Sequence, residues 1–200
     1  MLLSRKSLVF LAVSAVTVAL DQVTKWWVYA HIDEGYGEIE VIPGLFSLVH
    51  AQNPGAAIGL LRDFEYRMWV FYAFTVIAVG IIVDLWRRLP RRDWFHSATL
   101  GLILAGAVGN AIDRVAKQTV TDFLRVYTEI PSIKAWLIDT FGTYEWPTFN
   151  VADSALVVGV AVFLGHYLFL DDNAEGEDEW PEDDEASDQE PTDELAGSSP

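Results

Sequence analysis

Long apolar runs separated by short polar segments make up most of the first 170 residues. Four runs reach the length of about 20 apolar residues that a helix needs to cross a bilayer; they cover roughly residues 7–30, 66–86, 94–114 and 149–170. Amphipathic aromatic side chains favour the membrane interface, and Trp residues lie near the ends of these runs: Trp26, Trp27, Trp69, Trp86, Trp94 and Trp146. The pattern therefore predicts an α-helical membrane protein with four transmembrane helices.

The distribution of basic residues predicts the orientation of these helices. The short segment between the second and third runs carries Arg87, Arg88, Arg91 and Arg92, and a further Arg and Lys precede the first run. Short loops rich in Lys and Arg stay in the cytoplasm. We therefore expect both termini in the cytoplasm, with loops 31–65 and 115–148 on the outer side of the membrane.

The N-terminal region allows a second interpretation. Arg5 and Lys6 followed by an apolar stretch are also typical of a cleavable secretory signal peptide. The apolar run continues through Trp26, Trp27 and Val28, which makes it longer than the apolar region of such peptides. An uncleaved first membrane span is the favoured interpretation.

The two outer loops carry their own periodicity. Residues 38–49 predict short strands around a Pro43–Gly44 turn, because Ile39 and Val41 alternate with acidic residues. In the second loop, four apolar residues share one helical face: Ile133, Trp136, Leu137 and Phe141. Pro131 precedes them and Gly142 follows. This second pattern predicts a short amphipathic helix, either lying on the membrane surface or packed in a lid.

Charge divides the chain into two parts. The net charge is −16 although 52% of the residues are hydrophobic. Residues 171–200 contain 14 of the 29 acidic residues and no Lys or Arg, which leaves 15 acidic and 13 basic residues in 1–170. We therefore predict a membrane-embedded domain over 1–170 and a disordered acidic cytoplasmic tail over 171–200. The tail is either a dispensable extension or a docking segment for a basic partner.

Composition also excludes several kinds of site. The chain has no Cys, which excludes disulfides, thiolate metal ligands and Cys nucleophiles. The His residues are scattered without the spacing of metal ligands: His31, His50, His96 and His166. We expect no metal, no other cofactor and no nucleic-acid partner.

Polar residues gather at one level, the predicted outer membrane interface. Ionisable residues inside membrane spans are costly and usually functional. The candidates come from the outer ends of three spans and from the two outer loops: Asp21, Lys25, Asn53, Asn110, Asp113, Arg114, Asp122, Asn150 and Asp153. This clustering predicts a polar site near the outer leaflet.

Several members of this cluster also have a purely structural interpretation, and Asn110 can bind backbone or lipid headgroups instead of substrate. Asp21 and Lys25 have i,i+4 spacing and can pair, either as a structural ion pair or as part of the site. Arg114 can anchor its helix by reaching the interface, although it closes a dense polar motif. Small residues in the third run favour close helix packing rather than function: Gly101, Ala105, Gly106, Ala107 and Gly109.

Asp122 and Asp153 are the candidates for catalysis. Two carboxylates close together at low dielectric share one proton, because both cannot readily ionise. One can then activate water as a general base while the other acts as a general acid. This chemistry requires neither a metal nor a thiol, but the sequence alone does not show that the two residues meet.

Five short motifs together resemble one known family. In chain order they are DQVTK, NPGAAIG, GNAIDR, VTDF and FNVAD, extending from Asp21 to Asp153. Their order and their positions relative to the predicted spans resemble the lipoprotein signal peptidase (signal peptidase II) family. The resemblance implies a four-helix membrane bundle with a small extracytoplasmic β-cradle. It also implies cleavage of prolipoproteins just before a diacylglyceryl-modified Cys.

The resemblance assigns roles to individual residues. Asp122 and Asp153 correspond to the family's catalytic pair. The family also has supporting Asn and Arg positions, which orient the substrate and the two catalytic Asp residues (the dyad). These positions correspond to Asn53, Asn110, Arg114 and Asn150. Gly55, Asp113 and Ala152 belong to the same motifs, and Asp21 and Lys25 match the first motif as support. The implied partners are a lipid-modified prolipoprotein and membrane lipids, and the implied state is a monomer.

Three features depart from the family pattern. Ile58 stands where the second motif usually has an aromatic residue, which affects packing under the substrate rather than chemistry. The stretch between the two catalytic candidates is longer than usual and contains the amphipathic segment around Trp136. The acidic tail is additional.

Two other classes of function remain open at this point. A small transporter can use intramembrane Asp, Lys and Arg as an ion relay, but here the polar residues lie at one level and no inverted repeat is visible. An assembly or chaperone subunit can use such groups to hold helices together. That second class accounts for Asp21 with Lys25 but not for Asp122 with Asp153.

Overall fold

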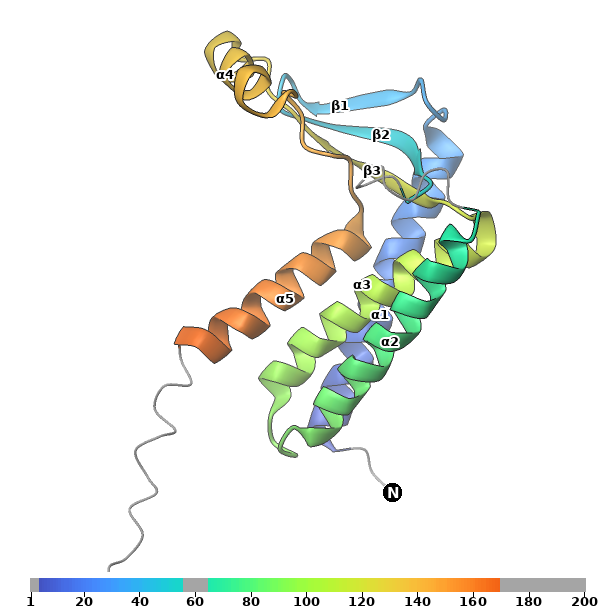
Figure 1. Cartoon of the computed structure of the whole chain (residues 1–200), viewed down its shortest axis with the longest axis vertical. Coiled ribbons are helices and arrows are strands. Elements are labelled where there is room, and N and C mark those ends of the chain that lie inside the picture. The colour runs from blue at the N-terminus through green and yellow to red at the C-terminus, as the bar shows by residue number, and fades with distance from the viewer. Residues whose placement is uncertain (1–3, 56–64, 170–200) are drawn as a thin grey trace, which may run out of the picture.

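The computed structural model describes residues 4–55 and 65–169, so the predicted tail and most of the NPGAAIG motif, including Ile58, lie outside the described residues. Long helices form a bundle with a small sheet across one end, and a short helix lies beyond the sheet (Figure 1). In chain order the elements are α1 (Arg5–His31), β1 (Glu38–Ile42), β2 (Phe46–Asn53), α2 (Arg67–Arg88), α3 (Trp94–Lys117), β3 (Val120–Val126), α4 (Pro131–Phe141) and α5 (Val151–Phe169).

Three of the helices are long and apolar enough to cross a membrane. They are α1, α2 and α3, with 27, 22 and 24 residues, and their positions confirm the first three predicted runs. Helix α5 is also apolar but shorter, with 19 residues. Side chains such as Val23, Phe74 and Val157 are more than 60% exposed on these helices. Apolar faces of this extent favour contact with lipid, so the chain is an integral membrane protein.

Helix α3 lies at the centre of the bundle and packs against α1, α2 and α5. Small residues permit this close approach. A Cβ atom on Gly106 would lie 2.5 Å from the carbonyl oxygen of Ala152, and one on Gly101 would lie 3.0 Å from that of Phe10. The predicted packing role of the glycines in this helix is therefore confirmed.

The sheet is antiparallel with strand order β1-β2-β3. The two strands predicted around the Pro43–Gly44 turn are confirmed, whereas β3 was not expected from the residue pattern. The register of β2 against β3 shifts between Leu48 and Ala51, where β2 contains one extra residue. Because a shift of one residue reverses the face that each side chain occupies, this bulge decides which residues of β2 face Asp122.

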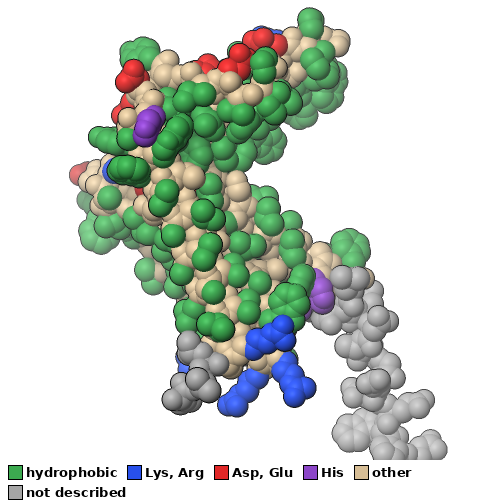
Figure 2. Space-filling model, turned by 180° about the vertical axis from the view of Figure 1, so that it is seen from behind, with side chains coloured by type: hydrophobic (Ala, Val, Ile, Leu, Met, Phe, Trp, Pro, Cys, Tyr) green, Lys and Arg blue, Asp and Glu red, His purple; other side chains and the backbone are tan. Residues whose placement is uncertain are grey.

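The predicted amphipathic segment forms α4, which begins at Pro131 and ends at Phe141, where Gly142 caps it in the left-handed conformation with φ of 75°. None of its residues is buried. Its placement on a membrane surface stays a prediction. At the opposite end of the molecule, Lys and Arg side chains gather where α2 and α3 meet (Figure 2), in agreement with the basic segment of 87–92.

Candidate active site

The end of the bundle beneath the sheet brings Asp122 and Asp153 together. Asp122 lies on β3 and Asp153 in the first turn of α5. Asn150 connects them: its side-chain Nδ2 donates to Asp122 Oδ1 at 2.8 Å, and its backbone N–H donates to Asp153 Oδ2 at 3.2 Å. The proximity that the sequence alone left open is thus present in the structure.

Helix α5 begins with a reciprocal capping arrangement that holds Asp153. The backbone N–H of Asp153 donates to Asn150 Oδ1 at 2.9 Å, while Asp153 Oδ2 accepts from the backbone of Asn150. This capping box satisfies two N–H groups that a helix start otherwise leaves unpaired. The spacing of the FNVAD motif therefore serves the helix start and the position of one carboxylate at once.

Asn110 on α3 completes the fixation of Asp153. Its Nδ2 donates to Asp153 Oδ1 at 2.7 Å. Its Oδ1 accepts from Asn150 Nδ2 at 3.1 Å and from Lys25 Nζ at 3.4 Å. Both carboxylate oxygens of Asp153 are consequently held by donors from different elements.

Asn53 holds the second oxygen of Asp122. Its Nδ2 donates to Asp122 Oδ2 at 2.9 Å, and its Oδ1 accepts from the backbone of Gly55 at 2.9 Å. Gly55 has a φ of 93°, and a Cβ atom there would lie 2.5 Å from the Phe71 ring. Only glycine fits this position without strain, and the turn that it allows orients the amide of Asn53.

Asp21, Lys25 and Asp113 form a buried ion group behind the dyad. Lys25 Nζ lies 2.9 Å from Asp21 and 3.1 Å from Asp113, and the exposed fractions of the three side chains are 4% or less. Asp21 also accepts from Gln22 Nε2 at 3.0 Å and from Ala152 N at 3.0 Å, and Asp113 accepts from Thr121 N at 3.0 Å. The group ties α1 and α3 to the start of α5 and to β3, and Lys25 is linked to the dyad through Asn110.

Burial dominates the electrostatics of Asp122, whose exposed fraction is 2%. Desolvation raises the pKa of Asp122 to about 6, against the lowering effect of the hydrogen bond from Asn53. The negative charge of Asp153 adds to the rise. A carboxyl with this pKa can exchange a proton near neutral pH, as acid–base catalysis requires.

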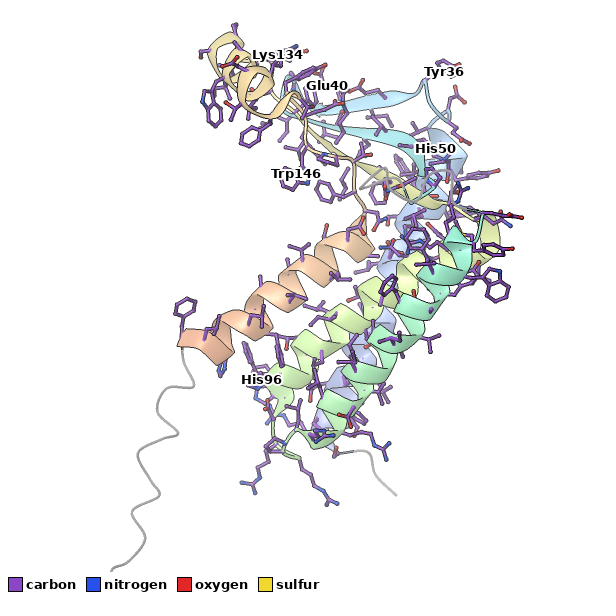
Figure 3. All side chains as sticks on the ribbon, viewed as in Figure 1. Tyr36, Glu40, His50, His96, Lys134 and Trp146 are labelled. Carbon is purple, nitrogen blue, oxygen red and sulfur yellow. The ribbon has the colours of Figure 1, made fainter. Side chains whose placement is uncertain are left out.

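Both carboxylates face a cleft of about 640 Å³. Arg114 lines the cleft, lies over the Phe71 ring at 4.6 Å and interacts electrostatically with Asp153 and Asp122. This placement favours membership of the site over a purely anchoring role for Arg114. Another wall consists of Thr143 and residues 145–149, where Trp146 projects into the space between the sheet and α5 (Figure 3).

Sequence reasoning missed a layer of polar residues beside the dyad. Gln52 Nε2 contacts His50 Nε2 at 3.0 Å and donates to Thr121 Oγ1 at 3.3 Å, while His50 Nδ1 contacts the carbonyl of Ile32 at 2.8 Å. His50 lies where the sheet meets the end of α1 (Figure 3). The sequence indicated their proximity to the site only by adjacency to two candidate residues, because Gln52 directly precedes Asn53 and Thr121 directly precedes Asp122.

Known proteins share this architecture. The family model described as signal peptidase (SPase) II matches residues 13–169. The lipoprotein signal peptidase of Listeria welshimeri is 40% identical over 160 residues, covering 80% of this chain and 92% of the relative. That of Geobacter metallireducens is 42% identical over 154 residues, covering 77% and 86%.

Solved bacterial membrane enzymes have a similar fold. One has a TM-score of 0.65 and 31% identity, covering 80% of this chain and 92% of its own. Another has a TM-score of 0.67 and 28% identity, covering 86% and 94%. The Listeria and Geobacter relatives are lipoprotein signal peptidases, and nothing in these comparisons supports the transporter alternative. The family model extends over all of the site residues, and the chain therefore belongs to the signal peptidase II family.

Proposed function

We propose that this protein is a membrane-embedded aspartic endopeptidase that removes signal peptides from prolipoproteins by cleaving just before a diacylglyceryl-modified Cys. The observation that carries the proposal is the pair Asp122 and Asp153, held together by Asn150 at the wall of a cleft. Membership of the signal peptidase II family supports the substrate class.

The surroundings of the two carboxylates suggest separate roles. We assign the shared proton to Asp122, because burial raises its pKa to about 6 and a substrate in the cleft would remove still more water. Asp153 lies in the first turn of α5, where the helix dipole favours a negative charge. Asp153 is therefore the general base and Asp122 the general acid.

The reaction then proceeds in two proton-balanced steps. Asp153 takes a proton from a water molecule as its oxygen attacks the scissile carbonyl, and Asp122 donates its proton to the carbonyl oxygen. The tetrahedral intermediate collapses when its hydroxyl returns a proton to Asp122. Asp153 gives its proton to the leaving nitrogen, which becomes the new N-terminus of the lipoprotein.

Neighbouring side chains position these groups rather than react. Asn53, Asn110 and Asn150 fix the carboxylate oxygens. Arg114 offers a cation beside the dyad that can bind a substrate backbone carbonyl and stabilise developing negative charge. Gly55 permits the turn that orients Asn53.

The proposal includes an arrangement in the membrane. We propose four spans, with α5 as the fourth, in the bacterial inner membrane, both termini in the cytoplasm and the dyad near the outer leaflet. A lipid-modified substrate then reaches the cleft sideways from the bilayer, and its acyl chains stay in lipid. Helix α4 lies near the outer surface, and the protein acts as a monomer.

The test is cleavage of a diacylglyceryl-modified prolipoprotein by purified protein in detergent. We expect Asp122→Asn and Asp153→Asn each to lose at least about 10³-fold in rate, because each removes one half of the acid–base pair. Asp84→Asn is the matched control, because Asp84 is an exposed carboxylate paired with Arg88 near the far end of α2. A chelator should leave the wild-type rate unchanged. Retained activity in either dyad variant would refute the aspartic mechanism.

A further inference from the structure

A second, apolar cavity lies beside the cleft that contains the dyad. This α4 pocket has a volume of about 540 Å³ and is walled by Val126 of β3, by Ile133, Leu137 and Phe141 of α4, and by Trp146. Several of these side chains are open to solvent: Phe141 is 65% and Trp146 68% exposed. Exposed apolar surface concentrated in a concavity indicates a binding site.

The α4 pocket is continuous with the cleft of the dyad. Thr143, Glu145, Trp146 and Pro147 line both cavities. Asp122 and Val126 also lie on the same face of β3, because residues separated by an even number along a strand share a face. Trp146 is held beside that strand, since its backbone N–H donates to the carbonyl of Val126 at 2.9 Å.

The separation of the two cavities sets the length of chain that connects them. Four residues along β3 correspond to roughly 13 Å, and an extended peptide covers the same distance in about four residues. An extended substrate cut at Asp122 therefore brings a side chain about four residues from the scissile bond to the α4 pocket.

The position of α4 decides which side of the scissile bond this residue belongs to. Helix α4 lies beyond the sheet and away from the helix bundle (Figure 1). The apolar signal peptide must remain beside the membrane helices, so the part of the substrate that reaches α4 follows the modified Cys.

Resting on the proposed function, we infer that the α4 pocket receives an apolar side chain from the mature part of the lipoprotein precursor, at about the third to fifth residue after the modified Cys. The pocket then acts as a specificity site of the peptidase. An aliphatic side chain there leaves water, whereas a polar one loses hydrogen bonds that the apolar walls cannot replace.

The test compares synthetic diacylglyceryl lipopeptides that carry Leu or Ser in turn at each of these three positions. The wild-type protein should prefer Leu at one of them by about tenfold in kcat/KM, the scale expected for burying one aliphatic side chain. Leu137→Ser should reduce this preference to about twofold or less. The ratio of two substrates on one protein sample does not depend on the fraction of folded protein.

Ile138→Ser is the matched control, because Ile138 is an exposed aliphatic residue of the same helix, 46% exposed, that does not line the α4 pocket. It should keep the wild-type preference. A second substrate series varies only the acyl chain length, and Leu137→Ser should leave that dependence unchanged.

The outcomes separate the two proposals. Cleavage by the wild type without preference at any of the three positions overturns the specificity site and leaves the peptidase function standing. Equal effects of Leu137→Ser and Ile138→Ser also overturn it, as does a variant effect that follows acyl chain length. If the folded wild type cleaves none of the lipopeptides, the proposed function fails and the specificity site with it.

Discussion

Burial of Asp122 should make the stability of the protein depend on pH in a defined direction. The pKa of this carboxyl rises from 3.8 to about 6 on folding, so the folded state binds a proton that the unfolded state releases. Stability is therefore lost as the pH rises from about 4 through about 6, and the full cost persists above that range. A shift of this size corresponds to at most about 3 kcal/mol.

The variant Asp122→Asn isolates this effect because asparagine cannot ionise. Its changed hydrogen bonds with Asn53 and Asn150 add an offset that does not depend on pH. We expect the stability of the variant relative to the wild type to increase by up to about 3 kcal/mol between pH 4 and pH 7, or about 6–12 °C in apparent Tm.

Thermal unfolding in detergent, followed by fluorescence of the 8 Trp residues, measures both proteins across this pH range. The control Asp84→Asn changes an exposed carboxylate and should not reproduce the increase. A difference between variant and wild type that stays constant from pH 4 to pH 8, or that shrinks as the pH rises, would refute the reasoning.

Three further predictions concern the proton, the ion group and the packing of α3. Because the acid role needs the proton of Asp122, kcat/KM should fall as the pH rises through about 6. The fall in kcat should come at a higher pH, because bound substrate buries the carboxyl further. A pH–rate profile without this decline contradicts the assignment. Lys25→Met leaves two buried carboxylates without their cation and should lower the free energy of unfolding by about 3–5 kcal/mol; an unchanged Tm would exclude that role. Gly109→Ala places a Cβ atom 2.6 Å from Asp21 Oδ2 and should lower the free energy of unfolding by about 1–3 kcal/mol. Gly80→Ala is the control, because a Cβ atom there has no atom within 4 Å. Equal Tm changes in the two variants would contradict the packing argument.

The sequence predicted the elements with strong periodicity and missed those that tertiary contacts create. The first three apolar runs and the hairpin around Pro43 are visible as local patterns, because their burial follows a fixed period. Strand β3 is mostly buried on both faces, so it shows no alternation of polar and apolar residues. Its pairing with β2 depends on the bulge near Ala51, which no local pattern reveals.

The candidate site shows the same division. The motif residues were identifiable by their type and their depth in the predicted membrane. The sequence did not show that Asn150 reaches Asp122, or that Lys25 reaches Asn110, because these contacts connect residues 28 and 85 positions apart. The contacts of His50 and Gln52 beside the dyad also depend on where the sheet meets α1.

Uncharged amide side chains around the dyad suit the proposed reaction, in which Asp122 must hold and release a proton. Asn53, Asn110 and Asn150 each donate to a carboxylate while their own oxygen accepts elsewhere, so they fix geometry without adding charge. A Lys in direct contact would favour the ionised form and lower the pKa of its partner. The only buried Lys of this region among the described residues is instead neutralised by Asp21 and Asp113 and reaches the dyad through an amide. This arrangement holds the carboxylates in place and leaves the pKa of Asp122 high enough for it to act as an acid.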